Sequence, residues 1–97
     1  MENDLMDQLL PIGSIITLKE GNRHLMIMGR FHRNLENGKI YHYATCLYPD
    51  GYQGGNTYYL CNHEHIEQVL FKGFQDEEEL QYRQLISNKL KELESDE

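Results

Sequence analysis

The stretch HLMIMGRFHRNLENGKIYHYATCLY, residues 24–48, decides the fold, because its pattern is that of two β-strands around one turn. Apolar and polar side chains alternate with a period of two on both sides of Asn37-Gly38. Asn-Gly is the pair that a two-residue type I′ turn favours, since both of its central residues need a positive φ. Such a turn places Phe31 opposite Ala44 and predicts a β-hairpin.

Shorter β-rich runs flank the hairpin at residues 14–19, 57–61 and 69–71, each bounded by glycine, asparagine or proline. Residues 25–28 are apolar on both faces, which predicts a strand in the middle of the sheet. We therefore expect an antiparallel sheet of four or five strands, which could be strongly curled.

A helix is expected after the last strand. Asp76 is followed by Glu79 at the spacing of a capping box, and acidic residues fill the first turn, where they complement the helix dipole. At 100° per residue, one face of this helix is apolar and carries Tyr82, Leu85, Ile86, Leu90 and Leu93. The sequence thus predicts an α+β fold in which a C-terminal helix packs on the sheet.

The length of 97 residues predicts one domain. We expect three parts: an N-terminal segment (1–11), a β-rich core (13–74) and the C-terminal helix (76–94). Leu5 and Leu9 are four residues apart, a spacing that favours one or two helical turns before Pro11 ends them.

Composition narrows the class of partner. The chain has 16 acidic and 9 basic side chains, a net charge of −7, whereas nucleic acids and anionic membranes need a basic surface. No stretch is long and apolar enough to cross a membrane, and the first four residues carry two acidic and no basic side chains, unlike a secretory signal. We expect a cytoplasmic protein that binds another protein and does not insert into membranes. The composition also allows the chain to form homo-oligomers.

Sites for chemistry are weakly indicated. His63 and His65 would share a face in a strand and are the best metal candidates, but a helical start would separate them and no motif supplies further ligands. Cys46 faces Cys61 if the loop between their strands is symmetric, with a register uncertain by a residue or two. We expect no cofactor, no metal and no catalytic residue. A small metal- or thiol-dependent enzyme is a remaining alternative.

Tyrosines are the most distinctive residues of the β-rich part. Some must be exposed, because neighbouring tyrosines fall on opposite strand faces, and tyrosine is enriched at protein interfaces. The alternative is that they pack the core. The candidate partner contacts are Tyr41, Tyr43 and Tyr58, together with Tyr82, Ile86 and Leu90 on the predicted helix.

Five blocks of sequence resemble domain-of-unknown-function family 4176. They are Leu9–Ser14, Leu25–Arg30, Cys46–Gly51, Asn62–Glu64 and Val69–Phe74, in the expected order over roughly residues 9–80. The resemblance implies a small cytoplasmic protein of Gram-positive bacteria, encoded beside type VII secretion components and LXG-type toxins. It implies no catalytic residue.

The function expected from this resemblance is that of a non-enzymatic adaptor or chaperone-like accessory protein for the export of type VII secretion substrates. An immunity protein that neutralises a cognate toxin is the alternative. Residues 71–97 carry 4 basic and 8 acidic side chains, which is more than half of the net charge. The helical end is therefore a place to look for a partner.

Overall fold

A computed structural model describes residues 8–95 of the chain. The elements are five strands, a single 3-10 turn and one long helix within that range. In order they are β1 (Ile15–Leu18), β2 (His24–Arg33), β3 (Ile40–Tyr48), β4 (Tyr59–Cys61), η1 (His63–His65), β5 (Ile66–Phe71) and α2 (Glu77–Ser95).

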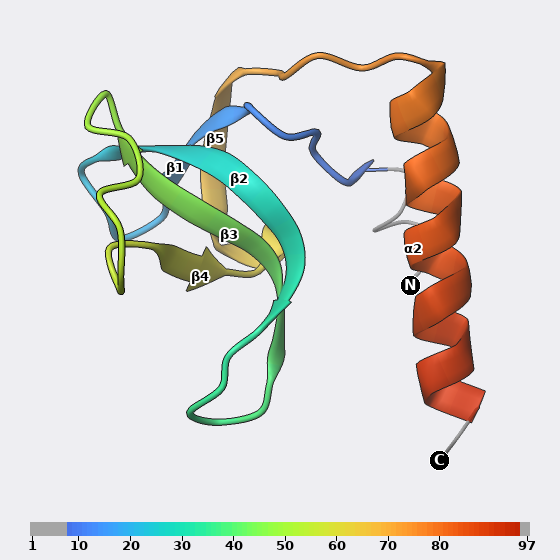
Figure 1. Cartoon of the computed structure of the whole chain (residues 1–97). Coiled ribbons are helices and arrows are strands. Elements are labelled where there is room, and N and C mark those ends of the chain that lie inside the picture. Colours follow the sequence, from blue (N-terminus) through green and yellow to red (C-terminus); the bar gives the residue numbers. More distant parts are fainter. Residues whose placement is uncertain (1–7, 96–97) are drawn as a thin grey trace. The chain divides into compact units, whose positions relative to one another are not determined.

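The five strands form one antiparallel sheet in the order β4-β3-β2-β1-β5 (Figure 1). β2 is central, as its apolar sequence predicts, and the sheet is not closed. The 3-10 turn η1 carries the chain from β4 at one edge to β5 at the other. The predicted α+β class, with an antiparallel sheet and a C-terminal helix, is confirmed.

The chain divides into two compact units, which we describe separately: Leu10–Phe74, and Gln75–Glu97 with residues 1–9. In the second unit, Asp76 caps α2, because its carboxylate accepts a hydrogen bond of 3.0 Å from the backbone N–H of Glu79. That the helix packs on the sheet, and that the chain is one domain, stay predictions. The helical turns expected around residues 5–9 lie almost entirely outside the described residues.

The predicted hairpin exists, but its register differs by two residues. Ala44 lies opposite Gly29 rather than Phe31. The loop is wider than a two-residue turn, because the backbone N–H of Asn34 bonds to the carbonyl of Lys39 at 2.8 Å, and Gly38 alone in this loop has a positive φ. Asparagine side chains hold this loop by accepting backbone N–H groups two residues further on.

Cys46 does not pair with Cys61, so the symmetric loop on which that pairing depended is not formed. Cys61 lies opposite Tyr43, and Tyr59 lies opposite Thr45, whose hydroxyl donates to the Tyr59 carbonyl at 2.9 Å. The loop between β3 and β4 is asymmetric, since pairing on β3 ends three residues before the strand does. Both cysteines are buried and free.

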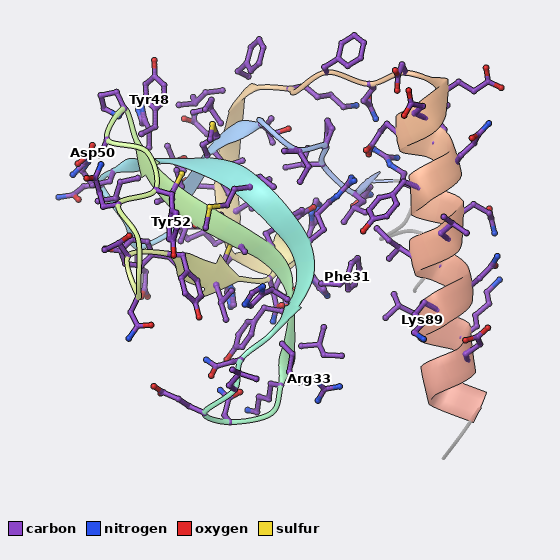
Figure 2. All side chains as sticks on the ribbon, viewed as in Figure 1. Phe31, Arg33, Tyr48, Asp50, Tyr52 and Lys89 are labelled. Atoms are coloured by element: carbon purple, nitrogen blue, oxygen red, sulfur yellow. The ribbon has the colours of Figure 1, made fainter. Side chains whose placement is uncertain are left out.

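The core of the sheet unit is built by β1 to β4. Its buried apolar side chains include Ile16, Leu25, Ile27, Tyr43, Ala44, Cys46 and Cys61. A bulge between Ile27 and Gly29 shifts the register of β2, and Phe31 further along has a φ of +53°. β2 bends strongly in this region (Figures 1 and 2), which gives the sheet its curl.

One buried serine connects the two ends of this unit. The Ser14 hydroxyl donates to the Pro11 carbonyl at 2.8 Å and accepts the backbone N–H of Gly73 at 3.0 Å. The Ser14 carbonyl also accepts the N–H of Ile27 at 2.8 Å. Gly73 fits so closely that a Cβ atom there would lie 2.2 Å from the Ile12 carbonyl oxygen. We call this the Ser14–Gly73 contact.

A Gly73→Ala substitution tests this close fit. The added methyl group would strike backbone rather than a flexible side chain, so we expect a loss of about 2 kcal/mol or more in the free energy of unfolding. The measurement is equilibrium unfolding in urea. Gly21→Ala is the control, because its Cβ would meet Leu18 at an ordinary 3.6 Å; equal effects of the two substitutions would contradict the prediction.

Candidate partner-binding surfaces

A groove lined by tyrosines lies beside the β2–β3 hairpin. Its volume is about 470 Å³, and its lining comes from the hairpin loop, β3, β4 and the residues before β4: Asn34, Leu35, Glu36, Tyr41, Asn56, Tyr58, Tyr59 and Leu60. Leu35 is 92% exposed at its rim, which is unusual for a leucine. The structure therefore brings two of the predicted contacts, Tyr41 and Tyr58, into one groove and adds Tyr59.

Local contacts hold the tyrosines of this groove in place. The Asn37 side-chain amide donates to the Tyr41 hydroxyl at 3.2 Å, so the loop fixes the ring at its outer end. The Tyr58 ring meets His32 of β2 edge to face, with 5.4 Å between ring centroids. Arg33, at the far end of β2 in Figure 2, donates to the Gly38 carbonyl at 2.9 Å and steadies the loop.

The third tyrosine candidate of the sheet unit, Tyr43, does not face a partner. Its side chain is fully buried, so its prediction as a surface contact is wrong. Its hydroxyl accepts the backbone N–H of Leu10 at 3.1 Å and lies 2.8 Å from Nδ1 of His63. The ring packs the core while the hydroxyl joins three separate parts of the chain.

The helix candidates belong to the other unit. Tyr82 is exposed on α2, while Ile86 and Leu90 are half-buried. Glu79 and Arg83 form an ion pair at 3.2 Å one helical turn apart, and Arg83 also donates to the Leu9 carbonyl. A contact between these helix residues and a partner stays a prediction.

Exposed apolar side chains on β5 and just after it were not anticipated from the sequence. Val69, Leu70, Phe71 and Phe74 are all between 47% and 79% exposed. Their strand is an outer strand of the sheet, and its pairing with β1 is interrupted by two irregularities. Apolar residues in a short strand normally predict burial, whereas these lie on or just after an edge strand and are exposed.

The histidines in and beside η1 take part in hydrogen bonds. Nδ1 of His65 accepts the backbone N–H of Asn62 at 3.0 Å, and Nδ1 of His42 accepts the N–H of His63 at 2.9 Å. Among residues 8–95, no group of three or more histidine, cysteine or acidic side chains is arranged to hold a metal ion. The 3-10 conformation at 63–65 separates the two candidates, as a helical start would.

Burial sets the ionisation of two of these histidines. It lowers the pKa of His42 from its ordinary value of 6.5, an effect that Glu64 opposes and that His63 and His65 reinforce. Burial also lowers the pKa of His63, again with Glu64 acting in the other direction. Burial therefore favours the neutral form of both rings.

The chain matches one known protein family. The family model described as a domain of unknown function, DUF4176, matches residues 9–82. The chain therefore belongs to this family, as its sequence blocks predicted. No curated protein and no solved structure matches the chain.

The family blocks meet one another in the structure. Leu9–Ser14 and Val69–Phe74 join at the Ser14–Gly73 contact, and Leu25–Arg30 bonds to the first block through Gly13 and Ile27 at 2.8 Å. The block that contains His63 reaches the first one through Tyr43. These motifs therefore hold the sheet together, which gives them a structural role.

No helix in the described part of the chain is apolar and long enough to span a membrane.

The cysteines permit a direct test of the thiol alternative. Burial raises the pKa of Cys61 to about 11, so at pH 8 only about one thiol in a thousand is ionised. We expect alkylation of native Cys61 to be at least about 100-fold slower than in urea, as measured by mass spectrometry of its peptide. Rapid modification of the native protein at pH 8 would contradict this and favour a reactive thiol.

Proposed function

We propose that the protein is a non-enzymatic adaptor or chaperone-like accessory factor that binds type VII secretion substrates of the LXG toxin class in the cytoplasm before export. The observation that carries the proposal is the groove of Tyr41, Tyr58 and Tyr59 with the exposed Leu35 at its rim. Aromatic side chains held in place by neighbours present a large contact area at a low entropic cost.

The distribution of charge supports a protein partner. Residues 10–74 carry 6 basic and 5 acidic side chains, whereas residues 1–9 and 75–97 together carry 3 basic and 11 acidic ones. The excess acidity therefore belongs to the helical unit, and the sheet unit is close to neutral. The acidic helical unit would steer a basic partner, while the aromatic groove of the sheet unit supplies contact area.

The family resemblance supports the identity of the partner. The chain belongs to the DUF4176 family, and the resemblance to this family implies a factor encoded beside type VII secretion components. An adaptor engages the targeting half of a toxin and would leave its toxic half free. An immunity protein, the second candidate, engages the toxic half and blocks its active site, and the acidity of the helical unit is the observation that favours it.

Binding to the separately expressed halves of a cognate LXG-type toxin distinguishes these functions. We expect capture of the N-terminal targeting half, with an affinity measured by calorimetry. Capture of the C-terminal half alone would replace the adaptor by an immunity protein, and binding to neither half would contradict both.

Point variants locate the contact. Leu35→Ser and Tyr58→Ala should each weaken binding about tenfold or more, because both side chains line the groove. Leu35→Ser leaves the fold intact, since this leucine is 92% exposed. Tyr52→Ala is the matched control: Tyr52 is an exposed tyrosine of the β3–β4 loop, labelled in Figure 2, and does not line the groove. Equal effects of all three variants would place the contact elsewhere.

A further inference from the structure

The turn between β4 and β5 depends on histidine nitrogen atoms that act as acceptors. A backbone N–H can only donate, so Nδ1 of His42 must be unprotonated to accept the N–H of His63 at 2.9 Å. The same holds for Nδ1 of His65, which accepts the N–H of Asn62. In both rings the single proton therefore resides on Nε2.

A second bond between the same elements has no such requirement. The side-chain oxygen of Asn62 accepts the backbone N–H of His42 at 3.1 Å. Neither group titrates near neutral pH. The contact between β3 and the turn thus combines this proton-independent bond with bonds to histidine nitrogens, at His42 and between the Tyr43 hydroxyl and His63.

The turn also holds a ready partner for a protonated His42. Oε1 of Glu64 lies 4.0 Å from Nδ1 of His42, and the Glu64 side chain is largely exposed. A proton on Nδ1 would turn this atom from an acceptor into a donor. It would then face the N–H of His63, which it can no longer accept, and the carboxylate of Glu64, to which it can donate.

We propose that His42, His63 and Glu64 form a proton-operated switch in the turn between β4 and β5. In the neutral state, Nδ1 of His42 accepts the His63 N–H and closes the turn. In the acid state, a solvent proton occupies this Nδ1, which donates to Glu64, and the His63 N–H loses its acceptor. The switch is independent of the proposed secretion function.

The groups that face His42 determine the direction in which its pKa is shifted. On its own strand lies Tyr43, from β2 comes the Phe31 ring at 5.7 Å, and from the turn come Glu64, His63 and His65. Burial of the ring is the largest effect, and it lowers the pKa of His42 despite the carboxylate. The turn is therefore closed above about pH 6.5 and opens as the pH falls through the lowered pKa of His42.

Opening the turn affects β5 before the rest of the sheet. The carbonyl of His65 accepts the N–H of Lys19 at 3.0 Å, which anchors the beginning of β5 to the end of β1. β5 pairs only with β1 among the described strands. By contrast, β2 and β3 share the longest ladder of the sheet and do not depend on the turn. Acid should therefore loosen the strand that carries the exposed Val69, Leu70 and Phe71.

Amide hydrogen exchange combined with NMR titration of the imidazole rings tests the switch between pH 7.5 and 5. We expect His42 to titrate below pH 6.5, and the protection factor of the His63 amide to fall about tenfold or more in parallel. The Ile27 amide in β2 should keep its protection, which shows that the sheet stays folded.

Glu64→Gln provides the matched variant. It removes the carboxylate that favours protonated His42, so the pKa of His42 and the loss of His63 protection should both move to lower pH. Glu67→Gln is the control, since it changes the same charge on β5 without acting on His42. Unchanged His63 protection while His42 titrates, or identical titrations in the two variants, would overturn the proposal.

Discussion

The Ser14–Gly73 contact is the constraint on which the sheet depends. β1 and β5 are joined through a hydroxyl that is fully buried and makes two hydrogen bonds, one to each end of the unit. A buried N–H without an acceptor costs about 1–3 kcal/mol, so replacing this hydroxyl would leave Gly73 unsatisfied. The absence of a side chain at Gly73 is equally necessary, because the Ile12 carbonyl occupies the space.

The contact also explains why β5 can remain apolar and exposed. Its last residues are held by backbone bonds and by close approach, rather than by burial of Phe71 and Phe74. At its other end, β5 is held through the turn at His63–His65. The edge strand is thus fixed at both ends, and its pairing with β1 is irregular between them. Irregular edge strands resist the addition of further strands, so the exposed apolar residues of β5 are better suited to side-chain contacts.

The elements of this fold could be predicted from local signals, whereas the register could not. Asn37-Gly38 located the hairpin, and Asp76 with Glu79 located the helix start. The hairpin register depends on Asn34 and Asn37, whose side chains stabilise a wider loop than the Asn-Gly pair predicts.

The sequence predicted some residues of the tyrosine groove but could not predict which tyrosines are exposed. Tyr41 and Tyr43 share a strand face by alternation, yet one lines the groove and the other is buried. The curl of the sheet and the position of η1 decide which ring is covered, and both depend on contacts that are distant in the sequence. Nothing in the sequence predicted the burial of Ser14 or its two hydrogen bonds, because a serine before a strand is usually exposed.

The most direct test of the Ser14–Gly73 contact is hydrogen exchange at the Gly73 amide. Because this N–H bonds to a buried hydroxyl, we predict that it exchanges only with global unfolding, at the same opening free energy as the Ile27 amide in the central strand. Its neighbours Lys72 and Phe74 are exposed and should exchange much faster. Exchange of Gly73 at the rate of these neighbours would contradict the account.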